Sequence, residues 1–216
     1  ICIGRGIVGH GCICCCFIGK CYFYFDIRDI LGIDLEGKVL GIVGLGSIGK
    51  LVASKASKGF GMKVIGLKRN AGSRQIDNIE VTQDLDYVLK NSDFVSLHIP
   101  LTGKTKGMIG KRELSLMKSE AFLINTARGE VVDEDALLEA LLQNKIAGAA
   151  IDVFKGEEPS KDNPLFKLEN VIVTPHMAWY SEEASHDLER KVAEESLKFV
   201  RGEKISYPVN HLKKVL

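Results

Sequence analysis

The sequence predicts an α/β fold of the Rossmann type, with a doubly wound parallel sheet, and three observations lead to this prediction. Apolar, β-rich runs alternate with helical segments from Lys38 onward, which is typical of a parallel sheet flanked by helices. The runs are mostly continuous, as expected for strands that are buried on both faces. The first run leads directly into Gly44-Leu-Gly46-Ser-Ile-Gly49, which is the order that a dinucleotide-binding βαβ unit requires.

The expected elements follow one another along the chain. The predicted strands cover residues 39–45, 63–67, 94–98, 121–125, 148–152 and 171–174, and the predicted helices cover 50–59, 85–90, 111–117, 133–143 and 182–201. Asp133 and Ser181 are suited to cap the last two helices, and Gly202 is suited to end the final one.

Each glycine of the pattern has a physical purpose. Gly44 permits a tight turn, Gly46 lets the backbone approach a pyrophosphate, and Gly49 lets the helix pack closely on the strand. The helix that follows offers N–H groups and the positive end of its dipole to phosphates. A glycine-rich turn without a ligand is the alternative interpretation.

The end of the second strand bears on the choice of cofactor. An acid there would accept hydrogen bonds from the ribose 2′-hydroxyl group of NAD, but this chain has Lys68 followed by Arg69. A cationic pair would neutralise a 2′-phosphate, so the sequence favours NADP over NAD. Alternatively, both are solvated surface charges and the selection is made elsewhere.

Composition excludes several classes of function. The 216 residues are 45% hydrophobic and 26% charged, with a net charge of +1, so nothing indicates a nucleic-acid or membrane partner. No apolar run reaches the ~18 residues that cross a bilayer. Because no signal-peptide pattern is visible either, we expect a cytoplasmic protein.

All six cysteines lie in the first 21 residues: Cys2, Cys12, Cys14, Cys15, Cys16 and Cys21. A disulfide framework would distribute them along the chain, and three adjacent cysteines do not match zinc-ligand spacing. We therefore expect no metal site, and we interpret residues 1–24 as foreign to the globular fold. A truncated or misread N-terminus is the corresponding hypothesis.

Polar side chains stand at the ends of several predicted strands: His98, Thr126 with Arg128, Asp152 and His176. Ligands bind at the carboxyl ends of strands in open α/β sheets. An arginine there can hold a carboxylate with two parallel hydrogen bonds. A histidine with a nearby carboxylate, such as Glu157 or Glu158, is a candidate proton donor whose pKa the carboxylate would raise.

Six motifs together resemble the D-isomer-specific 2-hydroxyacid dehydrogenase family. They are GIVGLGSIG, SLHIPLTGKT, INTARGEVVDEDAL, GAAIDVF, DNPL and NVIVTPHMAW, and they occur in family order over about residues 35–210. The ending from Pro175 looks most like the branch of the C-terminal-binding proteins, with phosphoglycerate dehydrogenases and glyoxylate/hydroxypyruvate reductases as close alternatives.

The resemblance implies roles for individual residues. Arg128 would bind the substrate carboxylate, His176 would be the acid/base, and Glu157 would pair with His176, with Glu158 as the fallback. The implied reaction is hydride transfer between a nicotinamide cofactor and a 2-oxo or 2-hydroxy acid. The implied cofactor-binding residues are Gly44, Gly46, Ser47, Ile48, Lys68, Arg69, His98, Pro100, Thr105, Thr126, Ala127, Asp152 and Ala178.

The chain also departs from the family. We expect its first 34 residues to form a Cys- and Gly-rich leader with only a remnant of the substrate domain, followed by the cofactor domain at 35–180 and a returning helix and tail at 181–216. The resemblance implies a homodimer. Three alternatives stay open: an oxidoreductase, a dinucleotide-sensing interaction protein without turnover, and a catalytically impaired cofactor-binding fragment.

Overall fold

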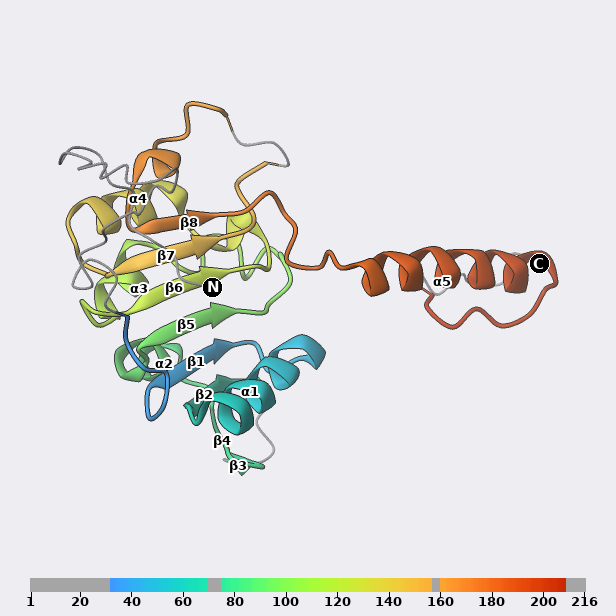
Figure 1. Ribbon diagram of the computed structural model, residues 1–216, viewed down its shortest axis with the longest axis horizontal. Coiled ribbons are helices and arrows are strands. Elements are labelled where there is room, and N and C mark those ends of the chain that lie inside the picture. The colour runs from blue at the N-terminus through green and yellow to red at the C-terminus, as the bar shows by residue number, and fades with distance from the viewer. Residues whose placement is uncertain (1–31, 70–74, 157–159, 209–216) are drawn as a thin grey trace, which may run out of the picture. The chain divides into compact units, whose positions relative to one another are not determined.

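The computed structural model describes residues 32–69, 75–156 and 160–208, and its main body is an eight-stranded sheet. The strands are β1 (Val39–Val43), β2 (Lys63–Leu67), β3 (Gln75–Ile76), β4 (Ile79–Thr82), β5 (Phe94–Leu97), β6 (Phe122–Asn125), β7 (Gly148–Ile151) and β8 (Val171–Val173). Their order across the sheet is β3-β4-β2-β1-β5-β6-β7-β8 (Figure 1). All neighbours are parallel except β3 and β4, which form an antiparallel pair. The doubly wound Rossmann sheet expected from the sequence is confirmed.

Helices cover both faces of the sheet. On one face lie α2 (Leu85–Asn91), α3 (Lys111–Leu116) and α4 (Glu134–Leu142), whose buried side chains join those of the central strands in one large apolar cluster. On the other face α1 (Ser47–Phe60) packs through Ala53 and Ala56 against β1, β2 and β4 in a second cluster. The chain thus changes face between β1 and β5, which creates a topological switch point there.

Most predicted elements are present with shifted ends. Each predicted strand is found, and the predicted helices lie within one to three residues of α1 to α5. Helix α1 begins at Ser47 rather than at residue 50, so Gly49 lies inside the helix and not in the turn before it. The sequence did not reveal the β3–β4 hairpin or the two short 3-10 helices Gly129–Val131 and Pro164–Lys167.

The chain divides into two compact units, and the break falls between Pro175 and His176. The second unit is built around α5 (Glu182–Val200), which begins at Ser181, whose side chain accepts a hydrogen bond from the backbone N–H of Ala184. No residue of α5 is buried. Among the described residues, no helix is long and apolar enough to cross a membrane.

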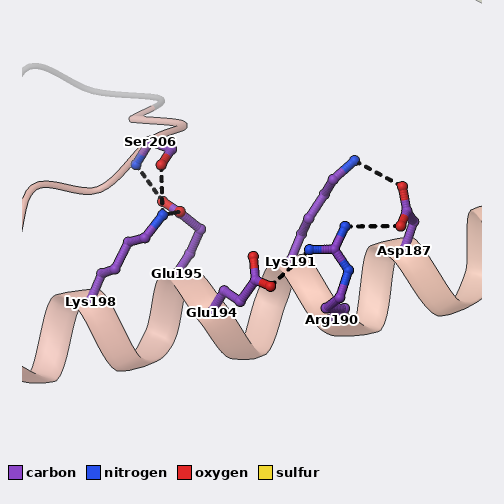
Figure 2. A network of polar contacts seen from close by, with 7 residues as sticks. All are labelled: Asp187, Arg190, Lys191, Glu194, Glu195, Lys198 and Ser206. Atoms are coloured by element: carbon purple, nitrogen blue, oxygen red, sulfur yellow. Dashed lines mark hydrogen bonds and ion pairs between the residues drawn. The ribbon is translucent and has the colours of Figure 1, made fainter.

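Ion pairs line one side of α5 and tie the following segment to it (Figure 2). Arg190 bridges Asp187 and Glu194 at 3.0 and 2.7 Å. Glu195 accepts hydrogen bonds from Lys198 Nζ at 2.7 Å and from the backbone N–H of Ser206 at 2.6 Å. The bond from Lys198 and those from the Ser206 segment lower the pKa of Glu195 to about 2, against a smaller opposing effect of desolvation. The negative charge of Glu195 therefore fastens the segment after α5 to the helix.

Candidate functional site

The glycine-rich turn between β1 and α1 has the geometry that its sequence predicts. Gly44 adopts φ +108°, and a Cβ there would lie 2.5 Å from the carbonyl oxygen of His98. A Cβ on Gly49 would lie 2.1 Å from the carbonyl oxygen of Gly44, so only glycine allows helix and strand to approach this closely. The backbone N–H groups of Gly44 and Leu45 both donate to the carbonyl oxygen of Leu67, which ties the turn to the end of β2.

The N-terminus of α1 presents an open group of backbone donors. Gly46 precedes the helix and supplies no side-chain cap, and the first turn holds no acidic residue. The helical hydrogen bonds begin with Lys50 N–H donating to the Gly46 carbonyl oxygen, so the N–H groups of Ser47, Ile48 and Gly49 precede them. A Cβ on Gly46 would meet no atom within 4 Å. This cradle fits a pyrophosphate, which would approach along the helix dipole.

The predicted cationic pair stands at the end of β2, beside the glycine turn. Lys68 is half-buried, and its backbone N–H donates to the Thr82 carbonyl oxygen at 2.9 Å. Arg69 is exposed. Both therefore lie at the carboxyl edge of the sheet, where the adenosine ribose of a dinucleotide binds in this fold.

His98 follows β5 directly and borders the same turn. Its backbone N–H donates to the Val43 carbonyl oxygen at 2.8 Å, and its ring atom Nε2 lies 2.9 Å from the hydroxyl oxygen of Ser96. Burial lowers the pKa of His98 and so favours the neutral imidazole.

The loop after His98 is fastened from within. Thr105 is 3% exposed; its hydroxyl group donates to the carbonyl oxygen of Pro100 at 2.7 Å and accepts from the backbone N–H of Thr102. Pro100 itself is exposed. Thr105 therefore braces the loop, with its hydroxyl group engaged in internal hydrogen bonds.

A loop held by Asn125 carries Arg128 at the end of β6. The Asn125 amide is 1% exposed; its oxygen accepts from the backbone N–H of Ala127 at 3.1 Å and its nitrogen donates to the carbonyl oxygen of Arg128 at 3.0 Å. Thr126 and Arg128 are exposed, and the Nη1 atom of Arg128 donates to the Ala127 carbonyl oxygen at 2.6 Å. The guanidinium group is thus accessible from solvent at the carboxyl edge of the sheet.

Asp152 directly follows β7 and is 3% exposed. Its carboxylate accepts a hydrogen bond from the hydroxyl group of Thr174 at 2.5 Å, and its backbone N–H donates to the Asn125 carbonyl oxygen. Asp152 thus joins β6, β7 and the end of β8. The predicted carboxylates Glu157 and Glu158 lie outside the described residues.

His176 and Ala178 belong to the second unit, where both are exposed. His176 has φ +52°, an uncommon conformation for a residue with a side chain. Its carbonyl oxygen accepts a hydrogen bond from Trp179 Nε1 at 3.1 Å, and the Trp179 ring meets that of Tyr180 edge to face. Both contacts lie within the short segment that His176 begins.

The structure therefore gathers most candidates of the first unit along one edge of the sheet. The glycine turn, Lys68, His98, Arg128 and Asp152 all follow the carboxyl ends of parallel strands. Three buried or half-buried side chains that hold them, Ser96, Asn125 and Thr174, were not singled out from the sequence. The described residues contain no group of three or more His, Cys, Asp or Glu that could hold a metal ion.

Known proteins are similar to this chain in sequence and in fold. The model of the family "D-isomer specific 2-hydroxyacid dehydrogenase, NAD binding domain" matches residues 24–178. The chain is 48% identical to a glyoxylate reductase of Thermococcus litoralis, over 80% of this chain and 52% of that protein. It is 45% identical to a D-3-phosphoglycerate dehydrogenase of Methanocaldococcus jannaschii, over 86% of this chain and 36% of that protein.

The fold is also that of a D-lactate dehydrogenase from Lactobacillus jensenii solved with NAD+. That structure matches with a TM-score of 0.77 and 33% identity, over 84% of this chain and 58% of that one. The chain thus spans between about a third and about half of the length of the curated relatives described above. It belongs to the D-isomer specific 2-hydroxyacid dehydrogenase family.

Proposed function

We propose that the chain binds a nicotinamide dinucleotide across the β1–β5 switch point and acts as part of an oxidoreductase of 2-hydroxy and 2-oxo acids. The main support is the turn from Gly44 to Gly49. Gly44 has a positive φ, Gly49 lets α1 pack closely on the turn, and the N-terminus of α1 is open, and these features suit a pyrophosphate. Membership of the family supports the same proposal.

The proposed roles follow the chemistry of the side chains. Arg128, exposed at the end of β6, would bind the substrate carboxylate through its guanidinium group. His176 would hold and transfer the proton at the substrate oxygen, with Glu157 as its carboxylate partner. When bound, the reduced nicotinamide would supply the hydride to the substrate C2 carbon. Asp152, Thr126, Ala127 and Ala178 would border the nicotinamide.

We further propose NADP as the preferred cofactor, because Lys68 and Arg69 place two cations where the adenosine ribose would lie. Ser47 and Ile48 would face the pyrophosphate, and His98, Pro100 and the loop braced by Thr105 would border the ribose. A homodimer stays a prediction from the resemblance, and a cytoplasmic location stays a prediction from the sequence pattern.

A coupled titration tests the proposal. NADPH and NADH are added to the purified chain while nucleotide fluorescence reports binding, and glyoxylate or hydroxypyruvate is then added while absorbance at 340 nm reports oxidation. We expect NADPH to bind and to be oxidised when substrate is added. The Arg128→Gln variant should still bind the nucleotide but should oxidise it at least ~100-fold more slowly, since a charged partner of the carboxylate is lost.

The other outcomes discriminate between the alternatives. Binding without oxidation would indicate a cofactor-binding unit that needs a further part of the protein for turnover. If neither NADPH nor NADH binds, the proposal is contradicted. Equal oxidation by wild type and Arg128→Gln would contradict the role of Arg128 alone.

A further inference from the structure

We propose that Ser96 is a positioning residue that fixes the tautomer of His98, so that the ring presents its Nδ1–H group as a neutral donor at the β1–β5 switch point. The expected acceptor is an oxygen atom of the dinucleotide, in its pyrophosphate or its ribose. The identity of the acceptor rests on the proposed function, whereas the tautomer itself does not.

The fold places this pair at the switch point. Ser96 lies opposite Ile42 of β1 and Ile124 of β6 in the parallel register. Ile42 belongs to the apolar cluster beneath α1, so Ser96 points to the same face of the sheet as α1. The hydrogen bond between Ser96 and His98 holds the imidazole ring on that face, just beyond the end of β5.

The backbone of His98 is fixed against the glycine turn. Its N–H donates to the carbonyl oxygen of Val43, and its carbonyl oxygen lies only 2.5 Å from the position that a Cβ on Gly44 would take. The backbone position of His98 is therefore coupled to that of the turn. Ser96 then determines the orientation of the ring and which ring nitrogen carries the proton.

The buried hydroxyl group of Ser96 determines which ring nitrogen of His98 carries the proton. Ser96 is 5% exposed, and among the described residues no buried polar side-chain atom lacks a partner. The ring of His98 is the hydrogen-bond partner found for this hydroxyl group within the described part of the chain. A buried hydroxyl proton needs an acceptor, and Nε2 can accept it only when the ring proton is on Nδ1. The pair therefore selects the Nδ1–H tautomer.

The ring that results is a neutral donor. Burial lowers the pKa of His98, which keeps the imidazole uncharged near neutral pH. Ser96 engages Nε2, and no hydrogen bond of the Nδ1 atom is found among the described residues. An Nδ1–H group suits the phosphate or hydroxyl oxygens of a nucleotide, which are hydrogen-bond acceptors.

Nitrogen-15 NMR of the histidine-labelled protein tests the tautomer directly, because the shifts of Nδ1 and Nε2 report which nitrogen is protonated. The sequence has five histidines, and the His98→Asn variant identifies the signals of His98. We expect Nδ1–H in the wild type and a mixture of tautomers in Ser96→Ala. A wild-type ring protonated on Nε2, or a Ser96→Ala ring that keeps one Nδ1–H tautomer, would overturn the proposal.

Nucleotide affinity provides the second readout. Ser96→Ala should raise the Kd for the reduced nucleotide roughly 3- to 10-fold, the equivalent of one neutral hydrogen bond, and Ser96→Thr, which keeps the hydroxyl group, should restore it. The matched control is Ser92→Ala, because Ser92 is also buried but its hydroxyl group donates to the Val88 carbonyl oxygen at the opposite edge of the sheet. It should lower the melting temperature and leave the Kd and the His98 signals unchanged.

The NMR signals and the nucleotide Kd distinguish a failure of the Ser96–His98 inference from a failure of the proposed function. If the wild type shows the Nδ1–H tautomer but binds neither nucleotide, the proposed function fails while the Ser96–His98 pairing stands. If the wild type binds but Ser96→Ala and Ser92→Ala weaken binding equally, Ser96 is only structural and the inference is wrong.

Discussion

At the scale of single residues, small polar side chains hold the carboxyl edge of the sheet. Asn125 fastens the loop that carries Arg128, and Thr174 donates to the carboxylate of Asp152. Asn125 is buried and Thr174 is half-buried. Removing the hydrogen-bond partner of either side chain would therefore leave a polar atom unpaired away from water. These side chains therefore determine where the exposed groups of the edge lie.

The sequence analysis singled out exposed residues of this edge but not the side chains that hold their loops in place. Gly44 and Gly49 were assigned the right physical roles because turn and packing constraints are local. Thr174 was not singled out because its partner, Asp152, is 22 residues away and is brought near only by the strand register. Asn125 has the ordinary appearance of a polar residue that ends a strand.

The cationic pair supports a prediction at this scale. Replacing both Lys68 and Arg69 by alanine should raise the Kd for NADPH roughly 10-fold, since charge-assisted bonds to a phosphate would be lost. The Kd for NADH should change less than about 2-fold. Fluorescence titration of both nucleotides measures the difference, with Lys58→Ala, at the exposed far end of α1, as the control. Equal weakening of both nucleotides would contradict selection by the pair.

At the scale of elements, the strand and helix pattern was predicted well where apolar runs are long. The β3–β4 hairpin was missed because β3 has only two residues and the apolar run of β4 is interrupted by Glu80. The helix predicted from residue 50 begins at Ser47 in the structure, three residues earlier. Glycine is a poor helix former, but Gly49 lies inside α1 because its missing Cβ lets the helix pack closely on the turn after β1.

Asp93 joins three elements at the opposite edge of the sheet. It accepts hydrogen bonds from the backbone N–H of Val39 in β1 and from Lys118 Nζ, which follows α3, while Asp93 itself precedes β5. Burial alone would raise the pKa of Asp93, but these two hydrogen bonds and the positive charges of Lys118 and Lys38 outweigh it and lower the pKa. The ionised form is therefore favoured by folding.

Linkage predicts how this contribution depends on pH. Because the folded-state pKa lies below the unfolded value of about 3.9, the stabilisation is complete above that value and is lost as the pH falls through the folded pKa. Asp93→Asn should lower the free energy of unfolding by about 1–2 kcal/mol at pH 7, with a smaller difference below about pH 3. Urea unfolding of wild type and variant at both pH values measures this difference in unfolding free energy. The control is Asp162→Asn, because Asp162 is exposed. A difference that is independent of pH would contradict the role of the charge.

At the scale of the whole molecule, family membership and the Rossmann sheet are established, whereas activity and substrate are proposals. The chain covers 52% of the glyoxylate reductase and 36% of the phosphoglycerate dehydrogenase to which it is similar. Arg128 and His176 belong to two separate compact units, and Glu157 lies outside the described residues. The division of the chain at residues 34 and 180 and the homodimer stay predictions.

The central claim is that a dinucleotide binds at the glycine-rich turn, and Gly46 tests it most directly. A Cβ on Gly46 would meet no protein atom within 4 Å, and the backbone there is extended. Gly46→Val should therefore keep the melting temperature while its side chain occupies the space of the pyrophosphate. The matched control is Gly59→Val in the last turn of α1, where a Cβ is equally unobstructed.

The measurement is the Kd for NADPH of the wild type and both variants, by fluorescence titration, with a thermal melt of each. The account predicts that the wild type and Gly59→Val bind alike, and that Gly46→Val melts normally but binds at least ~100-fold more weakly, because the pyrophosphate loses its close contact with the backbone. Unchanged affinity in a folded Gly46→Val protein would contradict the account.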